Sequence, residues 1–83
     1  VMHVHSRTLF DHWMSSGKLS TRADIPYGTP AMAQAVSALV LAQPGLPVLF
    51  AMAGHDEGMV AYGADVATTL NLLLNELDRS TTP

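Results

Sequence analysis

The sequence contains no cysteine, few basic residues and no long apolar run, and each of these absences excludes a class of protein. Without cysteine, the 83-residue chain has neither disulfides nor thiolate metal ligands, so a metal site must use His, Asp or Glu. Four Lys and Arg residues and a net charge of −3 argue against binding the phosphates of nucleic acid, which requires a basic face. The apolar stretches are far shorter than the roughly 20 residues needed to cross a membrane.

The beginning of the chain also lacks the pattern of a targeting signal. A secretory signal joins a basic segment to a long apolar core, and neither is present. We therefore expect a cytoplasmic protein. The chain opens with Val1 rather than Met, in a stretch that reads as a strand, which suggests a fragment, although a processed start would look the same.

The composition is that of one small folded domain covering residues 1–83. Hydrophobic residues make up 48% of the chain and charged residues 13%, which is the reverse of the balance in disordered chains. A chain of this length buries a smaller share of its surface than a typical domain, so we expect marginal stability.

The first stretch, "VMHVHS", alternates apolar and polar residues as a half-buried strand does. Because residues i and i+2 of a strand share a face, His3 and His5 should project together. Ser6 then suits a helix N-cap, and Gly17 suits the end of that helix. Four apolar residues share one face of the predicted helix: Leu9, Phe10, Trp13 and Met14.

A second helix, an apolar strand, a hairpin and a final helix follow an irregular stretch at 18–28. Thr29-Pro30 predicts a helix start and Pro44-Gly45 its end. Residues 46–53 are apolar throughout, as in a central strand covered on both faces. Residues 54–58 form a turn with His55 at its tip, leading into a strand at 59–62.

The last helix should run from Asp65 to about Asp78, before a loose tail at 79–83. Its predicted buried stripe consists of Val66, Leu70, Leu73, Leu74 and Leu77. The sum is an α/β domain of three helices and about three strands with antiparallel pairing, whose sheet edges would need covering.

The histidines suggest a metal centre. Two imidazoles on a strand face and a third on a turn match the pattern of a catalytic zinc site, with three protein ligands and one open position. The alternatives are a polar pair near the chain start and, for His55, a solvated turn residue. His12 falls beside Asp11 on the first helix and reads as a solvated histidine.

Other polar residues have weaker claims to a site. Asp56 and Glu57 follow His55 and have the chemistry to move protons beside a metal-bound substrate, but turn-forming acids are the simpler interpretation. Tyr27 and Tyr62 each have a hydroxyl to offer, and Tyr62 at a strand end suits packing. Three methionines are most simply core residues: Met32, Met52 and Met59.

At this level of detail the chain resembles the class II aldolase/adducin family of zinc-dependent sugar-phosphate aldolases. The resemblance rests on "VMHVHS", "IPYGTPAMAQAV", "LFAMAGHDEGMVAYG" and the closing amphipathic helix, in the family's order and over nearly all of the chain. Its specific part is the His-x-His pair followed by a later histidine. The better-known aldolases have a plainer His-Gly at this point, so Asp56 is a departure.

The resemblance implies that His3, His5 and His55 hold Zn²⁺ or another divalent metal. It also implies part of an α/β/α sandwich and a homo-oligomer, commonly a tetramer. In such aldolases the metal stabilises the enediolate formed when a small hydroxy-carbonyl or sugar-phosphate substrate is cleaved. Relatives catalyse epimerisation, decarboxylation or dehydration, and adducin keeps the fold without the metal chemistry.

Part of the family's machinery has no counterpart here. Its phosphate-binding loops and acidic proton-transfer residue precede the His-x-His strand, where this chain has nothing. We therefore assign no catalytic residue, with Glu57 as a weak candidate by position alone. Two readings stay open: an aldolase-like lyase or a fragment of one, and a non-catalytic, adducin-like oligomerisation module or inactive fragment.

Overall fold

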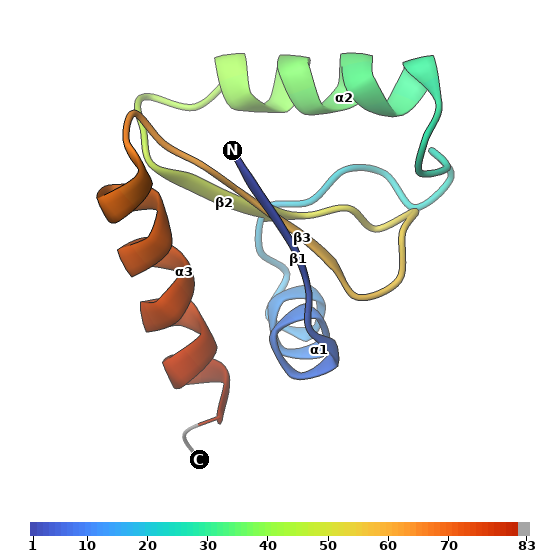
Figure 1. Cartoon of the computed structure of the whole chain (residues 1–83). Coiled ribbons are helices and arrows are strands. Elements are labelled where there is room, and N and C mark those ends of the chain that lie inside the picture. The colour runs from blue at the N-terminus through green and yellow to red at the C-terminus, as the bar shows by residue number, and fades with distance from the viewer. Residues whose placement is uncertain (82–83) are drawn as a thin grey trace.

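The computed structural model describes residues 1–81, which form three strands and three helices (Figure 1). The prediction of a mixed α/β domain is confirmed. In chain order the elements are β1 (Met2–His5), α1 (Arg7–Ser15), α2 (Pro30–Leu41), β2 (Val48–Ala51), β3 (Gly58–Tyr62) and α3 (Val66–Thr81). The predicted loose tail is wrong for residues 79–81, which complete α3, and residues 82 and 83 lie outside the described part.

The sheet has the order β1-β3-β2, with both pairs antiparallel. In the centre, Val60 of β3 pairs with His3 on one side and Phe50 on the other. The prediction that residues 46–53 form a central strand is therefore wrong: β2 is an edge strand. Its apolar sequence reflects burial of both faces. Such a sequence does not distinguish a central strand from an edge strand that is covered on both faces.

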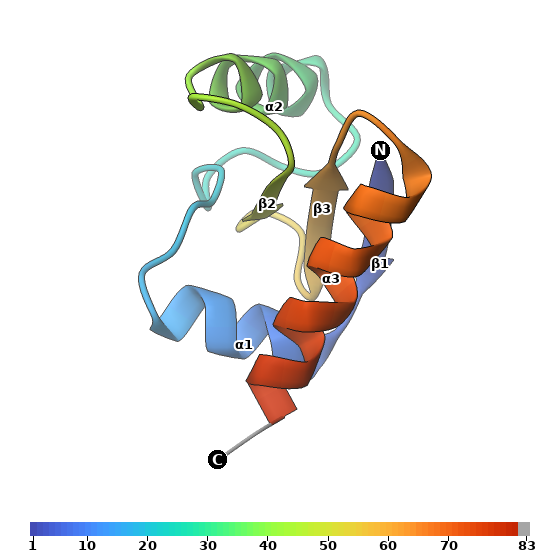
Figure 2. The same ribbon diagram turned by 90° about the vertical axis from the view of Figure 1, so that its left-hand side faces the viewer.

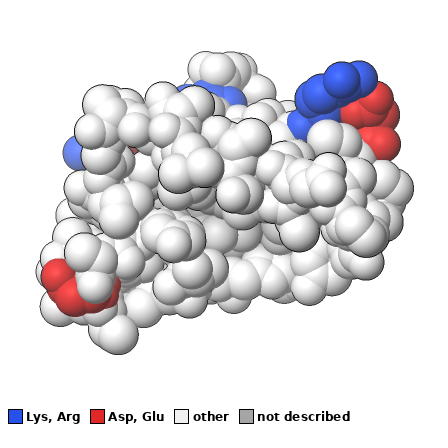
Figure 3. All heavy atoms as spheres, turned by 90° about the horizontal axis from the view of Figure 1, so that it is seen from above, with Lys and Arg blue, Asp and Glu red and all other residues white. Residues whose placement is uncertain are grey.

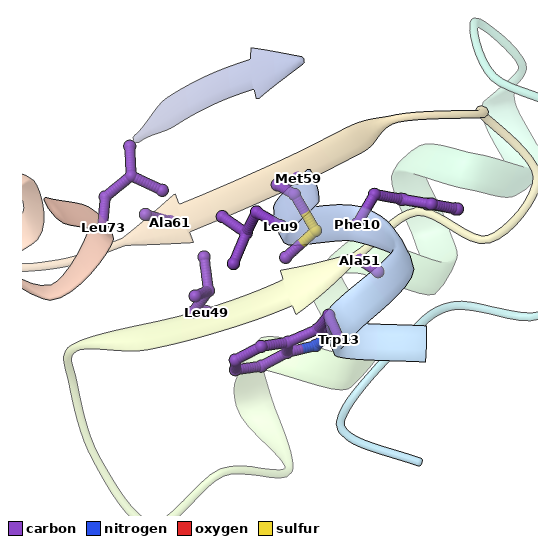
Figure 4. Packing of buried hydrophobic residues seen from close by; sticks show 8 residues of the cluster. All are labelled: Leu9, Phe10, Trp13, Leu49, Ala51, Met59, Ala61 and Leu73. Atoms are coloured by element: carbon purple, nitrogen blue, oxygen red, sulfur yellow. The ribbon is translucent and has the colours of Figure 1, made fainter. Parts of the chain in front are cut away.

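Helices cover both faces of the sheet, with α2 on one side and α1 and α3 on the other (Figures 1 and 2). Two apolar clusters fill the spaces between these layers. Figure 4 shows the first, which contains Leu9, Phe10, Trp13, Leu49, Ala51, Met59, Ala61 and Leu73. The second, beneath α2, contains Met32, Val48, Phe50, Met52 and Val60. The three methionines predicted as core residues are thus buried.

The predicted helix starts are confirmed at α1 and α2. The Ser6 hydroxyl accepts a hydrogen bond from the Leu9 backbone N–H (3.2 Å), and the Thr29 hydroxyl accepts one from that of Met32 (3.2 Å). Each satisfies a backbone donor that the first turn of a helix leaves unpaired. Gly17, with φ +66°, follows α1 as predicted. Met14 is exposed, although the helical spacing placed it on the buried face.

Helix α3 turns a different face to the core from the one predicted. Its buried residues are Thr69, Leu73 and Glu76, and of the predicted stripe only Leu73 is buried. The other four members are exposed: Val66, Leu70, Leu74 and Leu77. A hydrophobic pattern identifies the apolar side of a helix, but contacts with α1 and β3 determine which part of that side is covered.

The two edge strands of the sheet differ in whether another segment forms hydrogen bonds with their outer edge. Ala51 on the outer edge of β2 exchanges backbone hydrogen bonds with the irregular segment: its N–H donates to Leu19 (3.0 Å) and its carbonyl accepts from Thr21 (2.9 Å). Among the described residues β1 pairs only with β3. The segment after α1 therefore supplies part of the edge protection that such a small sheet needs.

The surface over α2 is almost uncharged. Viewed from the side of α2, charged side chains lie only near the margins of the molecule (Figure 3). The helix itself, PAMAQAVSALVL, contains no charged residue. No helix in the described residues is long and apolar enough to cross a membrane.

Asp65 stabilises the start of α3, and this leads to a prediction about pH. Its carboxylate accepts hydrogen bonds from the Thr68 N–H (2.7 Å) and hydroxyl (3.1 Å), which lower the pKa of Asp65 below its usual 3.8. We expect Asp65→Ala to lower the melting temperature at neutral pH. Because a depressed carboxyl pKa stabilises the fold only while the group is ionised, the difference should disappear as pH falls through that lowered value.

The measurement is thermal unfolding of both chains between pH 7 and pH 2. A difference between wild type and Asp65→Ala that stays constant down to pH 2 would contradict the capping role.

Candidate metal centre

Three of the four histidines meet at one end of the sheet. His3 and His5 project from the exposed face of β1, and His55 lies in the turn between β2 and β3. One ring nitrogen from each residue lies within 4.8 Å of the other two. The three are therefore close enough to bind one metal ion, as the sequence predicted, and His12 is not among them.

One distance within the cluster matches a zinc site closely. The Nε2 atoms of His5 and His55 are 3.3 Å apart. Two nitrogens bound to the same tetrahedral zinc at about 2.05 Å would lie about 3.3 Å apart. The spacing of these two imidazoles is compatible with ligands of a shared ion and also with a hydrogen bond between them. The ring centroid of His3 lies 4.9 Å from that of His5 and 5.5 Å from that of His55.

Strand register brings the third histidine to the other two. His5 pairs with Gly58 at the start of β3, and the Ser6 N–H donates to the carbonyl of Glu57 (3.1 Å). The turn is closed by the His55 N–H, which donates to Met52 (2.9 Å), and by the Gly58 N–H, which donates to His55 (2.8 Å). This compact turn folds His55 back beside the residue that pairs with His5.

Two glycines make this arrangement possible. A Cβ atom on Gly58 would lie 2.7 Å from Cδ2 of the His55 ring, and one on Gly54 would lie 1.9 Å from the Ile25 carbonyl oxygen. Both distances are shorter than real Cβ atoms allow. The His55 ring lies too close to Gly58, and the irregular segment too close to Gly54, for any side chain to fit at these two positions.

The electrostatics of the cluster favour the uncharged imidazole of His3. Desolvation of the ring, followed by the nearby imidazoles of His5 and His55, lowers the pKa of His3 below 6.5. A metal binds the neutral form of histidine. The cluster thus holds at least this histidine in the form that can act as a ligand near neutral pH.

The acidic residues beside His55 are paired with a cation. The guanidinium of Arg7 contacts the carboxylate of Asp56 and lies 3.5 Å from that of Glu57. Its hydrogen bond to Asp56 lowers the pKa of that carboxyl. Because Arg7 is two residues beyond His5, these ion pairs tie the start of α1 to the turn that carries His55.

Glu57, the weak candidate for proton transfer, occupies a position set by the turn. Its backbone has φ +65°, a left-handed conformation that is uncommon for residues other than glycine. Its carboxylate is engaged with Arg7, and its carbonyl binds the Ser6 N–H. These contacts fit a structural role for Glu57 in the turn.

Tyr27 packs beside the histidine cluster. The ring of Tyr27 stacks on that of His55, with centroids 4.0 Å apart and planes inclined by 19°, and its centroid is 5.6 Å from that of His3. Sequence reasoning named Tyr27 only for its hydroxyl, because nothing in an irregular segment predicts which turn it will contact. Tyr62 lies apart from the cluster, in a groove with residues of α2.

Comparisons with protein families, curated proteins and solved structures gave no match to this chain.

Proposed function

We propose that the chain binds a divalent metal ion, preferably Zn²⁺, and contributes it to an aldolase-like lyase acting on a small hydroxy-carbonyl or sugar-phosphate substrate. The observation that carries the proposal is the convergence of His3, His5 and His55, with ring nitrogens within 4.8 Å of one another. The class II aldolase type of fold is part of the same proposal.

The donor set suits the ion and the reaction class. Three imidazole nitrogens from a strand and a turn resemble catalytic zinc sites, which keep one position open, whereas structural zinc sites have four protein ligands. His3 and His5 are exposed, so solvent and small molecules can reach the cluster. A bound ion would act as a Lewis acid, providing positive charge where cleavage of a carbon–carbon bond develops negative charge.

The chain's own residues support this role by holding the ligands. The lowered pKa of His3 favours its neutral imidazole, and the ion pairs of Arg7 with Asp56 and Glu57 tie together the segments that carry the ligands. No residue here is assigned to proton transfer.

The test is the metal content and zinc affinity of the purified chain. We expect about one ion per chain by elemental analysis, measured before any chelator is used, and stoichiometric uptake when zinc is added to the metal-free form. A chain that contains no metal and takes up none would contradict the proposal. If zinc binds, cleavage of hydroxy-carbonyl and sugar-phosphate compounds tests the lyase reaction.

A second candidate function is a homo-oligomerisation module. The observation in its favour is a groove of about 240 Å³ between β1, α1 and α3, bordered by Leu9, Leu73, Leu74 and Leu77. Leu74 and Leu77 are 51% and 37% exposed, and β1 has no partner on its outer edge among residues 1–81. Size-exclusion chromatography of the metal-free chain tests this candidate, because a monomer would contradict it.

A further inference from the structure

We propose that Tyr27 is a positioning residue of the metal centre, whose ring fixes the orientation of the His55 imidazole. The inference rests on the metal binding proposed above and adds a residue that does not itself bind the ion. Its basis is the near-parallel contact between the two rings, with centroids 4.0 Å apart and an interplanar angle of 19°.

Among residues 1–81, no carboxylate or carbonyl group forms a hydrogen bond with the His55 ring. A metal-bound histidine almost always donates its second ring N–H to a carboxylate, a carbonyl or water, which fixes the plane of the ring. Among residues 1–81, the one hydrogen-bond contact of the His55 ring is with His5, another candidate ligand. The ring therefore has no hydrogen-bonding partner outside the cluster in the described part of the chain.

Ring contacts also hold the His55 imidazole. The His55 ring lies nearly parallel to Tyr27 and nearly perpendicular to His5, at 89°. Gly58 lies directly against it, since a Cβ there would be 2.7 Å from Cδ2. Tyr27 and Gly58 thus limit rotation of the imidazole, and this keeps Nε2 directed toward His5.

The segment that carries Tyr27 is fixed to the turn that carries His55. The Ile25 carbonyl touches Gly54 so closely that no side chain fits there. On the other side of Ile25, the Thr21 hydroxyl accepts a hydrogen bond from the Ala53 N–H (3.2 Å). The tyrosine and the histidine therefore belong to two backbone segments joined by direct contacts, and the stacked geometry is built into the fold.

The role is one for the aromatic ring rather than for the hydroxyl. Stacking requires a flat π-surface, which phenylalanine also provides and leucine lacks. Tyr27 is 52% exposed, so its replacement should disturb the fold much less than loss of a buried residue. Effects on the metal and effects on stability can thus be measured separately.

The experiment compares zinc affinity, by chelator competition, and the visible spectrum of the Co²⁺ form in wild type, Tyr27→Phe and Tyr27→Leu. We expect Y27F to match the wild type. Y27L should bind zinc about 10-fold more weakly, at the lower end of the effect of losing an outer-shell partner, with a changed Co²⁺ spectrum. The metal-free melting temperature should be nearly the same in all three chains.

Each other outcome is decisive. Y27L with wild-type affinity and spectrum would overturn the inference while leaving the metal site intact. Y27F as weak as Y27L would also overturn it, because the hydroxyl would then be the essential group. A Y27L chain that cannot fold without metal would show that the fold itself needs Tyr27, and would overturn it too. Failure of the wild type to bind zinc would instead defeat the proposed function.

Discussion

Replacing His55 with alanine is expected to weaken zinc binding by about 100-fold or more. The change removes one of three nitrogen ligands, and even loss of an outer-shell partner costs about 10- to 100-fold. The two remaining imidazoles, His3 and His5, lie on one strand face and cannot enclose an ion from the side of the turn. We expect His3→Ala and His5→Ala to have effects of similar size.

The matched control is His12→Ala. This histidine lies on α1 outside the cluster, so its loss removes an imidazole from the chain without removing a ligand. Isothermal titration or chelator competition with zinc would measure all four variants. If the three cluster variants bind zinc as tightly as His12→Ala does, these histidines are not the ligands.

The second large effect is on stability, and we expect it from Phe50→Ala. Phe50 has no exposed surface and packs between the sheet and α2, within the cluster that contains Met32 and Val60. Removing a buried aromatic ring leaves a cavity and costs about 3–5 kcal/mol. Domains are typically stable by only about 5–15 kcal/mol, so the variant should lose a large share of its free energy of unfolding.

Denaturant unfolding followed by circular dichroism would measure this loss, with Leu41→Ala as the control. Leu41 is 82% exposed at the end of α2, so its truncation should change stability by no more than about 0.5 kcal/mol. Equal effects from the two substitutions would mean that α2 does not pack on the sheet through Phe50.

The sequence alone determined the secondary structure and much of the candidate site. Local signals suffice where the cause is local: Ser6 and Thr29 cap the helices that follow them, and the alternation around His3 and His5 places both imidazoles on one face of β1. A single turn separates His55 from its strand, so the hairpin was also predictable. The helical spacing likewise identified Leu9 and Trp13 as core residues.

The tertiary structure decided what depends on contacts between distant segments. Strand order is such a case, because the apolar sequence of β2 is the same for a central strand and for an edge strand covered on both faces. The exposed leucines of α3 are another case. Residues such as Leu70 and Leu74 are buried only where another element packs against that side of the helix. Tyr27 and Arg7 likewise reach the turn around His55 through long-range contacts. Residue periodicity describes one element at a time, whereas these contacts arise only when whole elements pack together.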